Sequence, residues 1–366
     1  MDGSFIIPGR VGGSEHMLKN LVVGLAQASV AGDTIEVLTD HPWEASDPVR
    51  FRALLGLGNR FVRITRTLME RRDRYDAILF ANYFTPPFPR SARRPRFVTV
   101  IDDLQHRYMT VNFSLQKRIW LNAAHRTTLR LADATVAISD AVRVDIGACY
   151  GSKWLDRVQT IHNPISWERF GSAEAAGPAP VAGPYVLAVA AHYAHKNLET
   201  LVDAFAEVRK RMVRTDVHLL LVGQLGQNLR GIKGYRPVGP LIAKLDLHDA
   251  VHVAGYLDDR RLGDAYRNAT MFAFPSLFEG FAMPPVEALG FRLPVLTSRV
   301  TSMPEVTLGM AEYLDDPLDV TEMSERIAAM LSAPGDFTPS AGQAAKIRAT
   351  YEPARIGASY RRILAS

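Results

Sequence analysis

The residues best suited to chemistry lie in one short segment, 275–290 (PSLFEGFAMPPVEALG). It follows an apolar run that ends near Phe274, which we expect to be a strand. Gly280 permits a tight turn in which the backbone approaches a ligand closely. Pro284 and Pro285 are suited to the first turn of a helix. Free backbone N–H groups and the positive end of the helix dipole would then point at whatever lies above the strand, and a diphosphate suits that position.

Two carboxylates flank this turn, Glu279 before it and Glu287 inside the helix. A carboxylate accepts two hydrogen bonds from hydroxyl groups, which is what holding the diol of a sugar or a ribose requires. The same pattern also fits a structural interpretation, in which one glutamate caps the helix and the other faces solvent. The spacing alone does not decide between these two interpretations.

An α/β scaffold must position these residues. Short apolar runs alternate with helical periodicity along the chain, and strands that are apolar on both faces predict parallel sheets covered on both sides by helices. The predicted strands are 34–38, 77–80, 97–101, 134–138, 158–161, 185–189, 217–222, 251–253, 271–274 and 294–296. The predicted helices include 14–26, 113–131, 198–211, 262–268, 284–289 and 320–331.

One segment, 171–184 (GSAEAAGPAPVAGP), breaks this alternation and is interpreted as a linker. We therefore predict one Rossmann-like domain at 1–170 and a second at 185–350, with parallel sheets facing across a cleft. The amphipathic helix predicted within 351–366 is expected to cross back to the first domain. Open parallel sheets bind ligands at the carboxyl ends of their strands, so the segment after Phe274 is well placed for binding.

Composition restricts the class of protein. Of 366 residues, 47 % are hydrophobic and 22 % charged, as in a folded soluble protein. A net charge of +5 is too small to indicate nucleic-acid binding. The single cysteine, Cys149, allows no internal disulfide, and no Cys/His spacing indicates a metal site. Neither a membrane-spanning run nor a secretory signal is evident, so the expected compartment is the cytoplasm.

The stretch Arg50–Arg74 is rich in arginine with apolar residues between. Such a basic amphipathic stretch can lie on the anionic inner face of a membrane, as a peripheral contact. The alternative is a helix that packs its apolar side on the sheet and leaves its arginines in solvent.

The 275–290 segment resembles the signature of family 4 retaining glycosyltransferases of the GT-B fold, which carry Glu-Gly-Phe-Gly-x-Pro-x-x-Glu after a Pro-Ser pair. Further stretches resemble other parts of that family. They are VGGSEHMLKNLVVGL (11–25), IDDLQHRYM (101–109), VAISDAVRVDI (136–146), TIHNPIS (160–166), VLAVAAHYAHKNLETLVDAF (186–205) and TSRVTSMPEV (297–306). The pattern looks closest to mannosyl- and rhamnosyltransferase-like members that build bacterial surface polysaccharides or glycolipids.

The resemblance implies a function. A hexosyl or deoxyhexosyl group would pass from a nucleotide diphosphate sugar to a hydroxyl of a saccharide or lipid-linked saccharide, with retention and without a metal or other cofactor. GDP-mannose is the donor that it suggests. Acceptor choice would depend on loops of the first domain such as Asn82–Arg96.

The resemblance also implies roles for individual residues. Lys196 would neutralise the donor diphosphate, Glu279 would bind hydroxyls of the donor sugar, and Glu287 would bind the ribose. The catalytic set is Glu279, Lys196 and Asp102. The donor-binding set is Gly12, Gly13, Lys196, Glu279, Gly280, Phe281, Ala282, Met283 and Glu287.

The chain departs from the family pattern at several positions. Asp102 stands where the family usually has a histidine, unless His106 serves instead. Ala191 stands where many members have an arginine, and His192 or His195 could replace that charge.

Two further departures concern Ala282 and the start of the chain. Ala282 replaces the second glycine of the signature, and Met1 falls inside the family's first strand. We expect either residues upstream of Met1 in the native protein or a weakened first strand. Two alternative functions stay open: an epimerase or phosphorylase on the same fold, and a catalytically silent binding protein.

Overall fold

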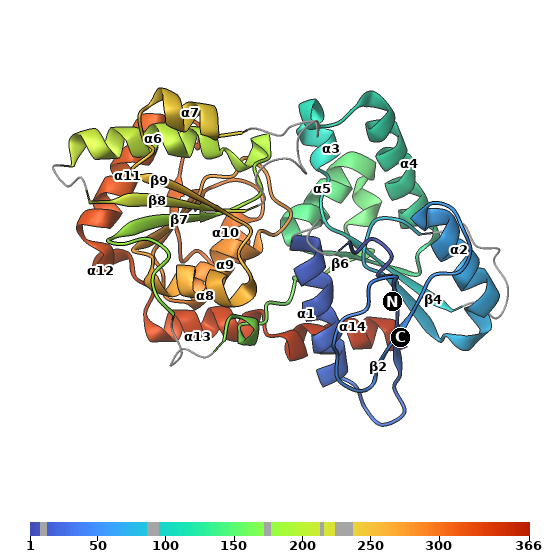
Figure 1. Cartoon of the computed structure of the whole chain (residues 1–366). Helices are drawn as coiled ribbons and strands as arrows, with labels where there is room; N and C mark the ends of the chain where they lie inside the picture. The colour runs from blue at the N-terminus through green and yellow to red at the C-terminus, as the bar shows by residue number, and fades with distance from the viewer. Residues whose placement is uncertain (8–12, 86–94, 172–176, 213–215, 224–236) are drawn as a thin grey trace. The chain divides into compact units, whose positions relative to one another are not determined.

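The computed structural model describes residues 1–7, 13–85, 95–171, 177–212, 216–223 and 237–366, and the chain forms two compact units (Figure 1). The first unit comprises Met1–Tyr108, Leu115–Ser166 and Ala349–Ser366. The second comprises Met109–Ser114 and Trp167–Arg348. The units divide at Trp167, so the described residues of the predicted linker, Gly171 and 177–184, belong to the second unit.

The second unit is built on a six-stranded parallel sheet. Its strands are β7 (Tyr185–Val189), β8 (His218–Val222), β9 (Val251–Gly255), β10 (Met271–Phe274), β11 (Val295–Ser298) and β12 (Glu312–Leu314). Their order across the sheet is β12-β11-β10-β7-β8-β9. The strands therefore run outward in both directions from β7, in the order of a doubly wound fold, and the chain changes direction between β7 and β10.

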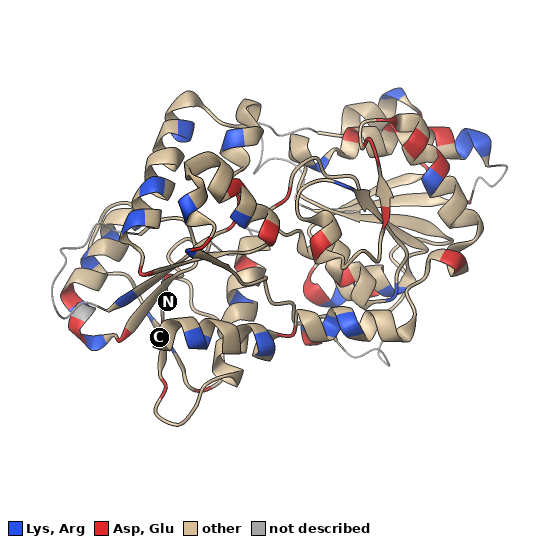
Figure 2. Cartoon of the chain, turned by 180° about the vertical axis from the view of Figure 1, so that it is seen from behind, with Lys and Arg blue, Asp and Glu red and all other residues tan. Residues whose placement is uncertain are grey.

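Helices cover both faces of this sheet (Figure 1). One face packs on α6 (Leu198–Arg211), α7 (Gly239–Lys244) and α11 (Val320–Ser332), whose apolar side chains share one core cluster with the strands. The other carries α8 (Asp259–Asn268) and α9 (Met283–Gly290). The remaining helices are α10 (Met303–Val306), α12 (Pro334–Phe337) and α13 (Ala341–Thr350). Strands β7 to β11 contain no Lys, Arg, Asp or Glu, and Figure 2 shows charged residues on the surrounding helices and loops, as expected for a sheet buried on both faces.

The first unit contains two parallel sheets that meet at one residue. The strands are β1 (Ile35–Leu38), β2 (Val49–Arg52), β3 (Ala77–Phe80), β4 (Arg96–Ile101), β5 (Ala134–Ala137) and β6 (Val158–Thr160). They form a β1-β2 pair and a β3-β4-β5-β6 sheet. Asp2 bridges Leu38 and Phe80, so the strand expected at this position is a single bridging residue.

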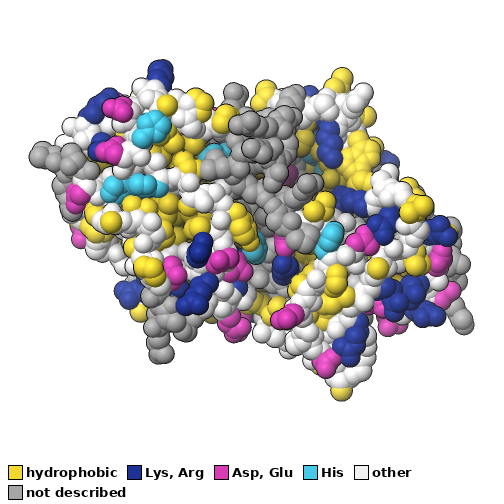
Figure 3. All heavy atoms as spheres, in the orientation of Figure 1, with side chains coloured by type: hydrophobic (Ala, Val, Ile, Leu, Met, Phe, Trp, Pro, Cys, Tyr) yellow, Lys and Arg dark blue, Asp and Glu magenta, His cyan; other side chains and the backbone are white. Residues whose placement is uncertain are grey.

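The helices of the first unit are α1 (Gly13–Gln27), α2 (Arg60–Arg71), α3 (Gln105–Tyr108), α4 (Leu115–Leu131), α5 (Asp140–Tyr150) and α14 (Pro353–Ala365). Ser139 caps α5 by accepting a hydrogen bond from the N–H of Val142 at 3.2 Å. Hydrophobic side chains also reach the surface over α4 (Figure 3), where Leu115 and Ile119 are exposed.

The C-terminal helix α14 docks on α1 through two glycines. A Cβ atom at Gly24 would clash with the backbone of Pro353, and one at Gly357 would clash with the carbonyl of Gly24. The Arg361 guanidinium also pairs with Asp33 at 2.6 Å. The return of this helix to the first unit agrees with the expectation from the sequence. The glycine contact supplies its docking site, because two helices approach this closely only where neither carries a side chain.

The basic stretch Arg50–Arg74 uses its apolar side in the core. Leu54, Ile64 and Leu68 are buried in a cluster that includes residues of β1, β3 and β4. Its arginines form ion pairs: Arg63 with Asp40, Arg52 with Glu36 and Arg66 with Glu70. This arrangement matches the second interpretation of the stretch, a helix that packs its apolar side on the sheet. Because Leu54, Ile64 and Leu68 are buried in the core, they cannot also enter a membrane.

We expect Gly24→Ala to lower the free energy of unfolding by about 1–3 kcal/mol, because the added methyl group must push α14 away from α1. This loss should exceed the gain of about 1 kcal/mol that alanine normally brings to a helix. Urea unfolding measures the difference. Gly335→Ala is the control, since a Cβ there meets no atom within 4 Å; equal stability of Gly24→Ala and the wild type would contradict the close packing.

Candidate active site

Two loops that follow neighbouring strands bring the predicted residues together. Lys196 ends the short 3-10 helix Ala194–Lys196 after β7, and Glu279 lies in the loop after β10. Since β7 and β10 are adjacent and parallel, both loops leave the same edge of the sheet. The place is the switch point of the strand order, where doubly wound sheets bind ligands.

Hydrogen bonds fasten the two loops to each other. The side-chain amide of Asn197 donates to the carbonyl oxygens of Pro275 at 3.1 Å and Pro317 at 2.6 Å. The N–H of Leu277 donates to the carbonyl oxygen of His195 at 2.7 Å. Asn197 has a left-handed backbone, φ 56°, which asparagine tolerates better than most residues. The sequence suggested no role for Asn197 beyond the resemblance, and the structure assigns it the joining of the loops.

An ion pair forms the centre of the site. Lys196 Nζ lies 2.5 Å from Glu279 Oε1, and the two side chains are 17 % and 10 % exposed. The hydroxyl of Ser276 also lies 2.6 Å from Oε1. Both contacts fall on one carboxylate oxygen, which leaves Oε2 oriented by the pair and able to accept a hydrogen bond from a hydroxyl group.

The backbone of Glu279 is fixed by a third loop, between β11 and α10. The N–H of Glu279 donates to the hydroxyl of Thr301 at 3.1 Å, and the hydroxyl of Ser302 donates to the carbonyl oxygen of Glu279 at 3.1 Å. Ser302 is buried. Three loops therefore hold this carboxylate, and a rigid support of this kind is what a binding group needs.

The turn into α9 shows what one departure from the family signature costs. Ala282 has φ 60°, a left-handed conformation in which glycine is not strained, and it precedes the first residue of the helix, Met283. For alanine this conformation costs roughly 1–2 kcal/mol. Pro284 and Pro285 carry no N–H, so donors at this helix start must come from Met283 and from the preceding loop.

Glu287 is buried on α9 and both of its oxygens are engaged. Arg169 lies 2.7 Å from Oε1, and the hydroxyl of Tyr266 donates to Oε2 at 2.8 Å. Arg169 also pairs with Asp259 at 2.5 Å. Burial opposes the charge of Arg169, yet Glu287 and Asp259 raise its pKa, so the guanidinium stays charged. Each oxygen can still accept a second hydrogen bond, so the ribose contact stays a prediction.

Some predicted residues are not brought into this cluster. Gly12 lies outside the described residues, as do 86–94 of the predicted acceptor loop. Gly13 is the exposed first residue of α1, in the other unit. By contrast, Gly280 and Phe281 directly follow Glu279, and Met283 begins α9. All three are buried beside the site.

Two acidic pairs elsewhere, Asp258–Asp259 and Asp315–Asp316, lie at helix starts or in loops. Asp258 caps α8 by accepting a hydrogen bond from the N–H of Arg261 at 2.8 Å. The N–H groups of Asp315 and Asp316 both donate to Glu322, at 3.0 Å. Among the described residues, no group of three His, Cys, Asp or Glu side chains could hold a metal ion.

Asp102 follows the carboxyl end of β4 in the first unit. Its side chain is half-buried, and Oδ1 has no hydrogen-bond partner among the described residues. Burial, together with the charge of Asp103, raises the pKa of Asp102 to about 7. A carboxyl group with this pKa is partly protonated near neutrality, and in that form it can donate a hydrogen bond as a histidine does.

The histidines of the chain are less suited to the roles considered for them. His106 is buried against His125, with ring centroids 5.0 Å apart, and burial lowers its pKa to about 4. Burial also lowers the pKa values of His192 and His195 to about 4. All are therefore neutral at pH 7, so His192 and His195 cannot supply the positive charge of an absent arginine.

We expect Arg169→Met to cost about 3–5 kcal/mol of stability, because it leaves the buried carboxylate of Glu287 without its cation. The double variant Arg169→Met/Glu287→Gln should lose less than the sum of the two single variants. Urea unfolding of all three gives the coupling. The control is Arg209→Met, whose partner Asp249 is largely exposed, and it should cost less than about 1 kcal/mol. Additive losses would mean that the pair is not coupled.

The raised pKa of Asp102 predicts a specific pH dependence. The unfolded chain ionises this carboxyl near pH 3.8, whereas the folded protein does so only near pH 7. The stability that this group contributes is therefore present below pH 3.8 and is lost as the pH rises to 7. Compared with the wild type, Asp102→Asn should gain stability progressively across this interval and then level off. A constant difference between the two proteins from pH 4 to 8 would refute the shift.

Comparisons with known proteins agree with this geometry. Residues 11–169 match the family described as Glycosyltransferase Family 4, and residues 173–348 match Glycosyl transferases group 1. The chain is 34 % identical over 144 residues to MMP alpha-(1->4)-mannosyltransferase of Mycolicibacterium hassiacum, covering 39 % of this chain and 33 % of that protein. The chain thus spans about a third of the length of this curated relative, and smaller shares of others.

Solved structures share the fold. Sucrose-phosphate synthase from Thermosynechococcus elongatus superposes with a TM-score of 0.78 at 19 % identity, over 97 % of this chain and 94 % of that one. HepE from Anabaena, in complex with UDP and glucose, gives a TM-score of 0.71 at 16 % identity, over 97 % and 96 %. At such identities these likenesses show the fold. The two family matches, which together span most of the chain, show that this protein belongs to glycosyltransferase family 4, and the structural likeness shows that it has the GT-B fold.

Proposed function

We propose that the protein transfers a hexosyl or deoxyhexosyl group from a nucleotide diphosphate sugar to an acceptor hydroxyl. The observation that carries the proposal is the Lys196–Glu279 ion pair at the switch point of the second sheet. An ammonium and an oriented carboxylate placed together suit a donor that carries a diphosphate beside a sugar. Similar proteins support it: one is a mannosyltransferase, and the structure of HepE contains UDP and glucose.

In the proposed reaction the bond between the anomeric carbon and the diphosphate oxygen breaks as the acceptor oxygen bonds to that carbon. The departing diphosphate gains negative charge, which Lys196 neutralises as a point charge. Glu279 accepts hydrogen bonds from sugar hydroxyls and fixes the ring. The acceptor proton passes to an oxygen of the departing diphosphate on the same face, which gives retention without a protein base or a metal ion.

Asp102 is proposed to contact the donor sugar from the first unit, as the third member of the catalytic set. Gly12, Gly13 and the loop Gly280–Met283 are proposed as backbone contacts to the phosphates or the sugar, and Glu287 as the ribose contact. We propose GDP-mannose as the first donor to test. An epimerase, a phosphorylase and a silent binding protein remain alternatives, and product analysis with labelled donor separates all three from a transferase.

We also propose that the protein works at the inner face of the membrane, where it would meet a saccharide or lipid-linked saccharide acceptor. No helix among the described residues is long and apolar enough to cross a bilayer. A peripheral contact by Arg50–Arg74 would depend on its exposed arginines, because Leu54, Ile64 and Leu68 are buried. Its strength should then fall steeply with added salt.

Lys196→Ala and Glu279→Ala should each lower the transfer rate roughly a hundredfold, because each removes a preorganised group that stabilises the transition state. The assay uses radiolabelled GDP-mannose and a mannosyl acceptor, and proton NMR of the product gives its anomeric configuration. Lys244→Ala, an exposed lysine on α7, is the matched control and should keep the wild-type rate.

Binding provides a second readout that does not need the acceptor. A nucleotide sugar present at about 100 times its dissociation constant should stabilise the wild type by about 2.7 kcal/mol, and Lys196→Ala should lose most of this gain. Wild-type rates in both active-site variants would rule out the proposed function.

A further inference from the structure

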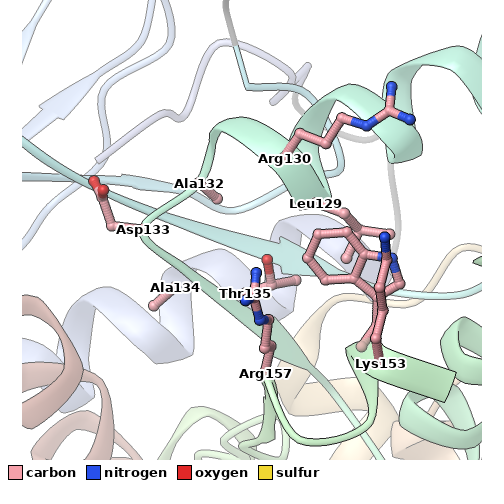
Figure 4. A pocket seen from close by; sticks show the side chains of 9 residues that line it. Leu129, Arg130, Ala132, Asp133, Ala134, Thr135, Lys153 and Arg157 are labelled. Carbon is pink, nitrogen blue, oxygen red and sulfur yellow. The ribbon is translucent and has the colours of Figure 1, made fainter. Parts of the chain in front are cut away.

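A cavity of about 700 Å³ opens at the opposite edge of the first sheet from Asp102 (Figure 4). Its lining includes Ala134 and Thr135, which begin β5, and Arg157, which directly precedes β6. Strands β4, β5 and β6 are parallel, and Asp102 follows the other end of β4. The cavity therefore lies at the amino ends of these strands, away from the end at which Asp102 lies.

Basic side chains dominate this cavity. Arg130, near the end of α4, and Lys153 and Arg157, on either side of Trp154, line it, and all three are exposed. Arg126 lines a smaller hollow that shares Arg130 and Lys153 with it. None of these four cations forms an ion pair with a carboxylate of the described residues. Figure 2 shows the same bias along α4, which carries basic but no acidic residues.

The acidic residue in the lining is turned elsewhere. Asp133 accepts a hydrogen bond from the N–H of Phe97 at 2.8 Å, so its carboxylate is directed toward β4. Figure 4 shows it pointing away from Lys153 and Arg157. Like charges gathered without counter-charges repel one another, so the cavity favours an anion from outside the chain.

An aromatic side chain completes the cavity. The Trp154 ring has Lys153 Nζ at 5.6 Å and the Arg157 guanidinium at 5.8 Å from its centroid. Leu129 and Thr135 are buried in the lining and add an apolar surface and a hydroxyl group. The cavity therefore combines cations, a hydroxyl donor and an apolar surface within one concave space.

We propose that this cavity binds a phosphorylated ligand, whose phosphomonoester or diphosphate lies among Arg130, Lys153 and Arg157 and whose attached ring or acyl part lies against Trp154. A phosphate group matches this set because it has several acceptor oxygens, and a guanidinium can bind two of them at once. Two sources offer this chemistry, a soluble phosphate ester and the headgroup of an anionic lipid. The site does not depend on the proposed transferase reaction.

The test compares four proteins. They are the wild type, the triple variant Arg130→Gln/Lys153→Gln/Arg157→Gln, the matched control Lys244→Gln/Arg355→Gln/Arg362→Gln, and Lys196→Ala. The two triple variants remove the same charge from exposed positions, and circular dichroism and thermal unfolding check that each is folded. Binding of inorganic pyrophosphate is measured by calorimetry. Sedimentation with phosphatidylcholine vesicles, with and without phosphatidic acid, measures binding to a lipid phosphomonoester.

The expected result is that the cavity variant loses about tenfold or more in affinity for one of these two probes, since each lost charge-assisted hydrogen bond weakens binding. The matched control and Lys196→Ala should retain that binding. Loss for pyrophosphate alone would identify a soluble ligand, and loss for phosphatidic acid vesicles a lipid headgroup. Equal binding by the cavity variant and the matched control, with both probes, would overturn the proposal, as would loss of all pyrophosphate binding in Lys196→Ala.

Discussion

The ion pair between Lys196 and Glu279 is the interaction on which the site depends. These residues are 83 positions apart in the chain, and they meet because β7 and β10 are neighbours in the sheet. The ammonium of Lys196 and the carboxylate of Glu279 stabilise each other, because both side chains are largely shielded from solvent. The same pair offers complementary charges to a ligand with a diphosphate at one end and hydroxyl groups at the other. Asn197, Ser276 and Ser302 are needed because an ion pair acts as a binding site only when its position is fixed.

A second charged cluster consists of Glu287, Arg169 and Tyr266, and its glutamate lies on α9, the helix that follows the Glu279 loop. Its carboxylate differs from that of Glu279 in its hydrogen-bond partners. Its carboxylate is buried and both oxygens have protein partners, whereas Glu279 has an oxygen free to bind hydroxyls. The two glutamates of the family signature are therefore not equivalent in this chain. Arg169 stands directly after the point at which the chain enters the second unit, so this network also anchors that entry to α8 and α9.

Much of the fold could be predicted from the sequence, because strands buried on both faces have continuous apolar runs. Strands β2 and β12 were missed: β2 (VRFR) alternates charged and apolar residues, and β12 is only three residues long. Lys196 and Glu279 were named from their motifs, and the structure brings them together. Arg169, Tyr266, Asn197 and Thr301 were not named, since their roles depend on contacts between distant segments. The left-handed backbone of Ala282 was likewise invisible, although the missing signature glycine marked the position.

If a donor diphosphate binds to Lys196 at this switch point, a crystal structure with bound nucleotide diphosphate should reveal it. We expect density for a phosphate within hydrogen-bond distance of Lys196 Nζ, with the ribose near α9. Nucleotide bound at another place in the molecule, with Lys196 still paired only to Glu279, would refute this role of Lys196.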